Sequence, residues 1–444
     1  MPIVYSSLNH AMRVPLAAEI HSRPFMKLEA PELISHFAIY RNPDLGAGAP
    51  SGHIHHKTLN ALCAHFGVSA PANDAKYFYH DFGKFRLKWE CHTEFSTYTF
   101  ALRPDLEYTT EEAFEHMPVT HLPQEWLLSL KGRVMVAAHV ALEKGGAEVE
   151  SLQRIFEGNT MAGSQVMQGG ELYSDFAIQS DGFSRFVIRD VGMRAQQAGR
   201  LVQRVLEIET YRMFALLGLP QAQQAAPALN AIEGELVTLA ADMVQTDAAQ
   251  IEDGMGDGVV EQKLLGEITR LAARIEKLSL ETSYRFSASK AYFRLVHARI
   301  DELREIRIEG IPNVAEFMDR RLTPAMNTCE AVAARQEALA RRVANTNDLL
   351  RTRVGIIQEQ QNRKILQSMN RRAAQQLRLQ QAVEGLSVAA ISYYVVGLIG
   401  YSTKAVKAAG IIGNPDVVIG LAVPVVLGAV WLSLRNMHKR LHTA

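Results

Sequence analysis

Three closely spaced histidines are the residues in this sequence whose type and spacing could bind a metal. His53, His55 and His56 form an H-x-H-H cluster at the start of a proposed helix, within HIHHKTLNALCAHFG. Metal binding needs neutral imidazoles that converge with a carboxylate or with a further histidine. Neither an H-E-x-x-H nor an H-x-x-x-D arrangement accompanies the cluster. The histidines are candidate metal ligands, but the pattern favours a chain with no metal or other cofactor.

A second combination could supply a nucleophile. Cys91, His92 and Glu94 lie together in KWECHTEFSTYTF. A thiol activated by an imidazole and oriented by a carboxylate is one arrangement used in covalent catalysis. The segment has the composition of a strand, however, and neighbouring strand residues point to opposite faces. We therefore interpret Cys91 and His92 as diverging, ordinary strand residues.

The sequence also lacks the usual motifs of nucleotide and ester hydrolysis. It contains no G-x-x-x-x-G-K-[ST] phosphate loop, no G-x-G-x-x-G fingerprint and no G-x-S-x-G elbow. These absences favour a protein that is not an enzyme. The enzymatic alternative is a membrane-tethered enzyme with a site in the N-terminal region, among His21, Arg23, His53, His55 and Glu94.

Charge and cysteine content restrict the partners and the compartment. Lys plus Arg and Asp plus Glu each number 47 in 444 residues, so no global field attracts nucleic acid. The three cysteines, Cys63, Cys91 and Cys329, are far apart, which argues against a disulfide framework and indicates a reducing cytosol. The first residues show no signal-peptide pattern, so we expect no export.

Two uncharged stretches near the C-terminus predict a transmembrane hairpin. Residues 385–403 and 417–434 are each about long enough to cross a hydrocarbon core of about 30 Å. Basic residues concentrate outside the pair, namely Arg363, Lys364, Arg371, Arg372, Arg378, Arg435, Lys439 and Arg440. The connecting residues 404–416 carry only Lys404 and Lys407. The positive-inside rule then places both termini on the cytoplasmic side of a bacterial inner membrane. The alternative is an apolar hairpin buried in a soluble core.

The rest of the chain divides into two kinds of pattern. Residues 1–190 contain short extended runs, which predict an α+β or α/β cytoplasmic domain. These runs are LISHFAIYR, KFRLKWE, FSTYTFAL, RVMVAAHVAL and FSRFVIRDV. Residues 191–324 predict a helical domain, with helices at about 193–218, closed by Pro220, then 228–250 and 259–307.

A single long stalk helix is predicted over 325–384. This stretch contains no proline, and its apolar residues recur at spacings of three and four, as in a coiled coil. The stalk continues into the first span at 385–403, and a basic tail at 435–444 follows the second span. Because a lone helix of this length needs partners, we expect a homo-oligomer.

Several stretches resemble an uncharacterised bacterial family of membrane-anchored proteins of unknown function. They are HSRPF, HTEFSTYTF, GRLVQRVLEIETYRMFALLGLP, YRFSASKAYF, RRLTPAMNTCEA, RTRVGIIQEQQN and VEGLSVAAISYY. The resemblance implies no reaction, ligand or catalytic residue. The architecture also resembles CorA-type magnesium channels, although their Gly-Met-Asn signature is missing after the first span.

We therefore expect a membrane-anchored, oligomeric protein with a large cytoplasmic binding or scaffold region. Its expected partners are the lipid bilayer, further copies of the chain and an unidentified protein or ion. The alternative is a divergent CorA-like ion channel or transporter. In such a channel the pore candidates are Ser387, Ser392, Tyr394, Tyr401, Asn362 and Asn370. Helix packing is an equally good interpretation of these six residues.

Overall fold

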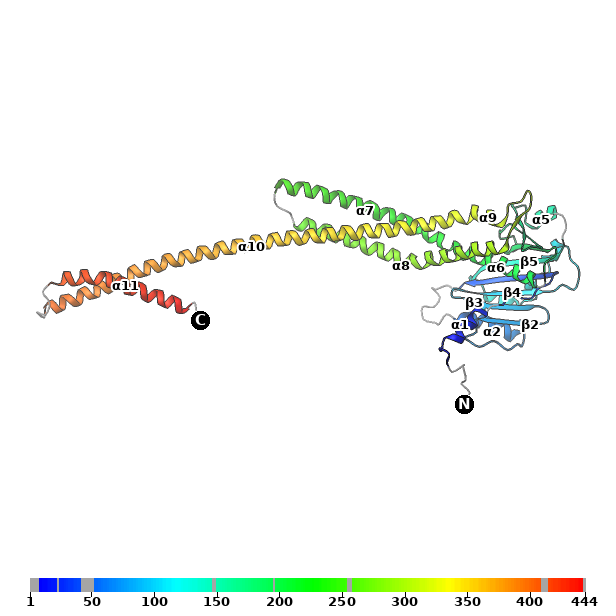
Figure 1. Cartoon of the computed structure of the whole chain (residues 1–444), viewed down its shortest axis with the longest axis horizontal. Coiled ribbons are helices and arrows are strands. Elements are labelled where there is room, and N and C mark those ends of the chain that lie inside the picture. The colour runs from blue at the N-terminus through cyan, green and yellow to red at the C-terminus, as the bar shows by residue number, and fades with distance from the viewer. Residues whose placement is uncertain are drawn as a thin grey trace, which may run out of the picture. The chain divides into compact units, whose positions relative to one another are not determined.

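The computed structural model describes residues 8–21, 24–40, 52–145, 149–194, 196–253, 258–408 and 414–441. The chain forms two compact units (Figure 1). The first, here called the sheet unit, comprises Met1–Asp242 and Glu267–Thr346. The second, here called the hairpin unit, comprises Met243–Gly266 and Asn347–Ala444.

The sheet unit is built on one mixed nine-stranded sheet, in the order β2-β3-β4-β1-β5-β8-β7-β6-β9. Every pairing is antiparallel except that of β5 with β8. The strands are β1 Glu32–Tyr40, β2 Tyr77–Asp81, β3 Arg86–Cys91, β4 Phe95–Leu102, β5 Val134–Lys144, β6 Ala162–Val166, β7 Gly170–Ser174, β8 Ser184–Asp190 and β9 Ile306–Arg307. The five predicted extended runs correspond to β1, β3, β4, β5 and β8, and these predictions are confirmed.

Helices cover both faces of this sheet. On one face, here called the α2 face, α2 (Gly52–His65) and α4 (Gln124–Ser129) pack on aromatic residues of β1, β3 and β4. On the opposite face, here called the α6 face, α6 (Gln197–Leu216) packs on the central strands. The alternation of β1 shows the division, because Phe37 packs on the α2 face whereas Ile34 and Ala38 pack on the α6 face.

The remaining helices extend this framework. The short helices are α1 Arg13–His21, α3 Thr110–Ala113, η3 Pro118–His121, α5 Val149–Ile155 and α9 Val314–Arg321. The long helices are α7 Gly218–Asp253, α8 Gly258–Leu303 and α10 Thr323–Ala408, and α11 Pro415–Leu441 follows them. The mixed α+β class and the long helices are thus confirmed.

Some predicted helix boundaries differ from the observed ones. The helix predicted at about 193–218 corresponds to α6, which ends at Leu216, but Pro220 does not close it. The helix predicted to start at 228 begins at Gly218 instead, and Pro220 lies in the first turn of this helix, α7, where a backbone N–H has no intrahelical acceptor and proline costs little. The helix that contains the predicted first span does not end at residue 403, because α10 continues through Lys404 to Ala408. Residues 409–413, which include Gly410 and Gly413, lie outside the described residues.

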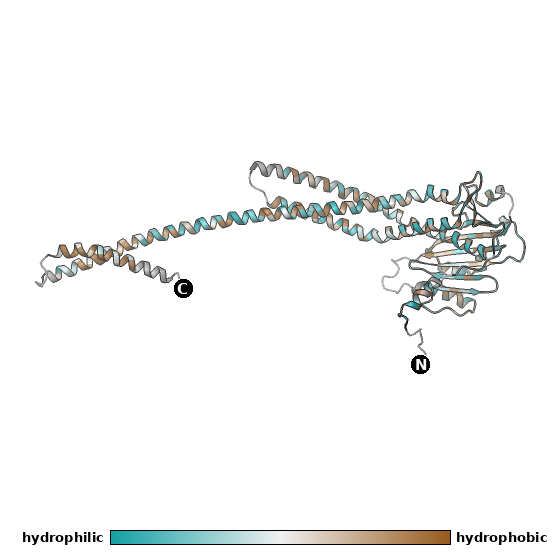
Figure 2. Cartoon of the chain, in the orientation of Figure 1, coloured by the Kyte–Doolittle hydropathy of each residue, from teal (hydrophilic) through white to brown (hydrophobic). Residues whose placement is uncertain are grey.

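The hairpin unit contains α11 and the parts of α7, α8 and α10 beyond the sheet unit. Figure 1 shows α11 folding back along the C-terminal end of α10. Gly400 of α10 approaches Ile419 of α11, since a Cβ built on Gly400 would lie 3.5 Å from Ile419 Cδ1. Figure 2 shows that these helical segments carry many hydrophobic residues. Most of them are exposed, as described below.

Candidate functional site

A cavity of about 340 Å³ lies between the α6 face of the sheet and α6 itself. The strands β1, β3 and β4 form one wall and α6 forms the other. The segment Pro24, Phe25, Met26 and Leu28 and a single side chain of α8, Arg299, complete the lining. The volume falls at the lower end of the roughly 300–1,000 Å³ that small-molecule sites occupy.

The strand register gathers polar side chains on the sheet wall of this cavity. His36 pairs with Thr99 across β1 and β4, and Lys88 pairs with the same Thr99 across β3 and β4. One step along the strands, Glu90 pairs with Thr97. Alternation places all five side chains on the α6 face, where hydrophobic residues would otherwise be expected.

His36 is held as a neutral imidazole in this wall. Its Nδ1 lies 2.9 Å from Thr99 Oγ1 and its Nε2 lies 3.3 Å from Thr210 Oγ1 of α6. Burial lowers the pKa of His36 to about 3, and the nearby charge of Lys88 acts in the same direction. The histidine therefore joins the sheet to α6 through two hydroxyl groups and carries no charge near neutral pH.

Lys88 brings a buried ammonium group to the cavity. Its Nζ donates to Gln203 Oε1 at 3.2 Å and lies 3.2 Å from Glu90 Oε2. An ammonium group has three donors. Within the described part of the chain these two acceptors leave one donor of Lys88 for a further acceptor.

The α6 wall contains a closed network of ion pairs. Glu207 accepts from Arg204 at 3.2 Å and from Arg299, and Arg299 also donates to Glu302 at 2.6 Å. Arg204 contacts Glu302 as well, so two guanidinium groups and two carboxylates balance one another. Gln203 joins this network to Lys88 by donating to Glu207 Oε1 at 2.7 Å.

Arg200 stands outside that network. Its guanidinium carbon lies 5.8 Å from the centre of the Phe25 ring, and the side chain is exposed at the edge of the cavity. No carboxylate among the described residues pairs with it. Arg200 is thus the cation of the lining whose charge the surrounding residues do not neutralise.

Gly199 allows the wall of residues 24–28 to close on α6. A Cβ at this position would lie 1.9 Å from the carbonyl oxygen of Met26. Such a contact is impossible without moving one of the two backbones. The glycine therefore fixes how closely this segment and α6 approach one another beside the cavity.

The histidine cluster lies on the α2 face and has structural partners. Nδ1 of His55 lies 2.9 Å from Ser96 Oγ, and Nε2 of His56 lies 2.9 Å from the carbonyl oxygen of Ala75. The side chain of His53 is outside the described residues. Among the described residues, no group of three or more His, Cys, Asp or Glu side chains is placed to bind a metal ion.

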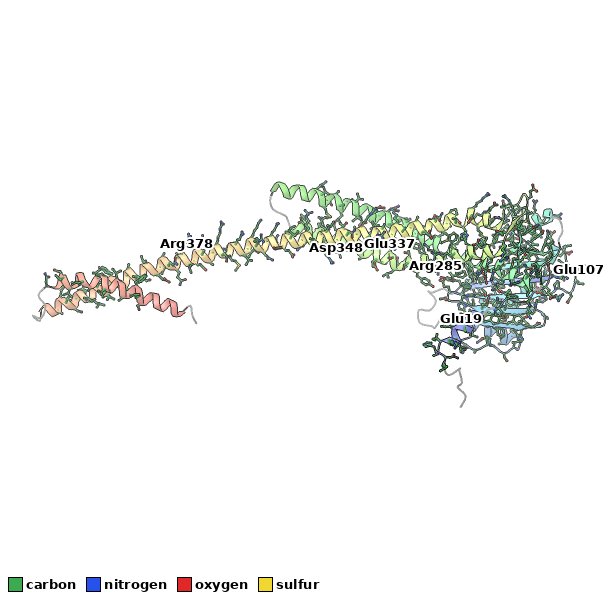
Figure 3. The ribbon with its side chains drawn as sticks, in the orientation of Figure 1. Glu19, Glu107, Arg285, Glu337, Asp348 and Arg378 are labelled. Atoms are coloured by element: carbon green, nitrogen blue, oxygen red, sulfur yellow. The ribbon has the colours of Figure 1, made fainter. Side chains whose placement is uncertain are left out.

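The proposed Cys91, His92 and Glu94 combination is divided between two faces of the sheet. Cys91 packs against the hydrophobic cluster of the α2 face, whereas His92 lines the cavity on the α6 face and stacks on Phe95. Glu94 forms a buried ion pair with Arg285 of α8, which Figure 3 labels. Cys91 and His92 thus diverge, as the strand pattern predicts.

The wider set proposed for an enzyme is not gathered into the cavity either. His55 bonds Ser96 on the α2 face, whereas Glu94 pairs with Arg285 from the opposite side. Arg23 and the side chains of His21 and His53 lie outside the described residues. The structure thus supplies no common site for the members that it describes.

The proposed pore residues differ among themselves. Ser392 is buried, whereas Tyr394 and Tyr401 are exposed. Ser387 is half-buried and donates to the carbonyl oxygen of Val383 at 2.8 Å. Asn362 and Asn370 are exposed on α10.

The sequence interpretation missed the cavity because its residues are distributed over six segments, namely residues 24–28, β1, β3, β4, α6 and α8. A signal was present in the strands, where Lys88 and Glu90 alternate with the buried Leu87 and Trp89. A polar residue on the inner side of a central strand usually requires a partner or a ligand. Within α6, Arg204 pairs with Glu207 and Arg212 pairs with Glu209.

Comparison with known proteins identifies the family of this chain. The family model described as "Protein of unknown function (DUF3422)" matches residues 8–441. No curated protein and no solved structure matches the chain significantly. Because the family model covers nearly the whole sequence, this chain belongs to the DUF3422 family.

Proposed function

We propose that this protein is a membrane-anchored, oligomeric binding protein. The hairpin of α10 and α11 inserts into a bilayer, the stalk assembles with other copies, and the sheet unit binds a small molecule in the cavity beside α6. The observation that carries the anchor is the exposure of an apolar surface on the hairpin. The cavity and its unneutralised Arg200 support the binding role.

The apolar residues of the hairpin lack the burial that a soluble core would provide. Two described helices, which include Thr323–Ala405 and Asp416–Ser433, are long and apolar enough to cross a membrane. Only 6% of the most apolar window in each helix is buried. Leu398, Leu421 and Val425 are among the exposed residues. Exposed apolar surface on this scale indicates a membrane or a protein partner, and its length and lack of charge favour the membrane.

The stalk supports assembly with further copies. Every side chain from Gln358 to Val383 is exposed, including Ile365, Met369 and Leu377. Arg378, labelled in Figure 3, belongs to the same stretch. Packing two or more such helices together would bury these apolar residues and leave the arginines and glutamines in water. The basic residues around the hairpin support a cytoplasmic location for both chain termini.

The anchor is tested by membrane fractionation followed by alkaline carbonate extraction. We expect the full chain to remain in the washed membranes and a chain ending at residue 383 to become soluble. The matched control is the full chain with Gln375→Glu, which alters the stalk but not the spans. Recovery of the full chain in the soluble fraction would refute the anchor.

Assembly is tested by measuring the mass of the full-length protein in detergent. Substituting Met369→Glu together with Leu377→Glu is expected to dissociate the oligomer, because two charges would enter its apolar contact. Gln367→Glu with Gln376→Glu introduces the same charges at polar positions and should preserve it. A monomeric wild-type chain refutes the oligomer. Selective ion flux through proteoliposomes that contain the protein would replace the binding role with the CorA-like alternative.

A further inference from the structure

We infer that the cavity beside α6 binds a small organic oxyanion, a carboxylate or phosphate carried on an apolar body. This inference rests on the proposal that the sheet unit is a ligand-binding unit, and it is independent of the membrane anchor. Three features of the described lining point to this class of ligand.

The first feature is the balance of charge. The lining contains four cationic side chains, Lys88, Arg200, Arg204 and Arg299, and two carboxylates, Glu90 and Glu207. Glu302 lies outside the lining and neutralises part of this excess by pairing with Arg204 and Arg299. The charge of Arg200 remains, and a guanidinium group binds carboxylate and phosphate through paired hydrogen bonds.

The second feature is a set of unused donors that a ligand could satisfy. Lys88 retains one N–H donor beyond Gln203 and Glu90. The hydroxyl oxygen of Thr97 is buried and has no hydrogen-bond partner in the part of the chain that the structure describes. A buried hydroxyl without a partner costs about 1–3 kcal/mol. A ligand oxygen would relieve this cost and would accept from the ammonium of Lys88.

The third feature is the apolar part of the lining. Phe25, Met26, Leu28, Phe95 and Leu206 contribute hydrophobic surface beside the polar groups. Small-molecule sites characteristically combine mostly apolar walls with a few polar anchors. An inorganic ion would leave this surface without contacts, whereas an anion attached to a ring or a short chain would cover it.

The experiment measures binding of phenyl phosphate and benzoate to the full-length protein in detergent, by titration calorimetry. Benzyl alcohol and benzylammonium are the neutral and cationic comparison probes. We expect at least one anionic probe to bind and both comparison probes to bind at least ~10-fold more weakly. Preference between the two anions distinguishes a phosphate from a carboxylate ligand. Equal binding of all four probes, or binding of none, overturns the inference.

Three variants locate the binding in this cavity. Arg200→Gln and Thr97→Val are each expected to weaken the anionic probe by ~10-fold or more. Arg270→Gln removes an exposed arginine elsewhere on the sheet unit and should leave binding unchanged. Thr97→Val should also raise or preserve the melting temperature of the ligand-free protein, because it removes an unpartnered hydroxyl. Unchanged affinity in both Arg200→Gln and Thr97→Val overturns the assignment of the site.

The outcome is separate from that of the membrane proposal. Anion binding by a protein that fractionates as soluble would refute the anchor and support this site. Membrane retention without anion binding would refute the site and support the anchor.

Discussion

The sheet unit and the hairpin unit place the same kinds of apolar residue in opposite environments. Leu59 and Leu62 are fully buried between α2 and the sheet. In the hairpin unit, Leu398 and Leu421 are 66% and 69% exposed. Hydropathy alone does not separate the two cases. The difference teaches that an apolar helix is a core element only where the rest of the chain supplies a surface to cover it.

The largest expected effect comes from truncating a large hydrophobic side chain to alanine in each of the two units. Phe100→Ala should destabilise the sheet unit by about 3–5 kcal/mol, because it opens a cavity among tightly packed aromatic residues. Phe100 is fully buried and its ring lies near those of Phe37, Phe85 and Trp126. Leu421→Ala should change the stability of the detergent-solubilised protein by under about 0.5 kcal/mol. Urea unfolding followed by circular dichroism measures both.

The comparison fails if the two substitutions have similar effects. A large loss for Leu421→Ala would mean that this surface of α11 is covered by a protein partner in the assembled molecule. A negligible loss for Phe100→Ala would mean that the aromatic cluster of the α2 face contributes little to the sheet unit.

A smaller contrast concerns ion pairs. Glu209 is buried in α6 and accepts from Arg212 and from Ser184, with Oε1 distances of 2.7 and 3.0 Å. Glu209→Gln should destabilise the sheet unit by roughly 3 kcal/mol, because it leaves a guanidinium group without its counter-charge. Glu359→Gln on the stalk breaks an exposed pair with Arg363 and should cost under about 1 kcal/mol. Urea unfolding measures both variants, and equal losses of unfolding free energy would contradict the expected difference between a buried and an exposed ion pair.

Mild acid should act on the sheet unit through two buried histidines on opposite faces of the sheet. Burial lowers the pKa of both His36 and His139 from 6.5 to about 3. Above pH 6.5 both histidines are neutral in the folded and in the unfolded chain, so the folded state has the full stability that these residues allow. Between about pH 6.5 and 3 the unfolded chain binds protons that the folded state excludes, so stability falls by about 1.4 kcal/mol per pH unit for each histidine.

This pH dependence is measured by urea unfolding at several pH values between 7 and 5. His36→Gln should reduce the slope of stability against pH, and His139→Gln should reduce it by a similar amount. His121→Gln serves as the control, since His121 is exposed. An unchanged slope in both variants would show that the buried histidines do not govern the acid response.

Much of the fold could be predicted from the sequence because the hydrophobic periodicity of a long segment indicates its secondary structure. The runs that became β1, β3 and β4 alternate or concentrate aromatic and β-branched residues, and α10 lacks proline throughout its stalk. The strands β6 and β7 were not predicted. They are short, contain glycine, and are joined by residues with positive φ at Met167, Gln168 and Gly169.

The candidate site was less predictable, because it depends on tertiary register. The pairing of His36 and Lys88 with Thr99 requires β4 to lie between β1 and β3, which no local pattern reveals. Arg200 reads as one more helix-surface charge beside Arg204 and Glu207. Its lack of a carboxylate partner among the described residues becomes visible only when the pairs from α8 are known.

The smallest expected effect concerns a buried hydroxyl group in the hairpin, that of Ser392. Ser392 is 3% exposed, and its hydroxyl has no hydrogen-bond partner among the described residues. By contrast, Ser402 donates to the carbonyl oxygen of Leu398 at 2.9 Å. Ser392→Ala should therefore leave the stability of the hairpin in detergent unchanged or raise it by up to about 1 kcal/mol, whereas Ser402→Ala should not raise it. Thermal unfolding in detergent measures the difference.

A clear loss of stability for Ser392→Ala would mean that its hydroxyl bonds a second copy of the chain, because a buried polar group in a membrane is stabilised only by a partner. The hairpin would then take part in assembly in addition to the anchoring role that we propose for it.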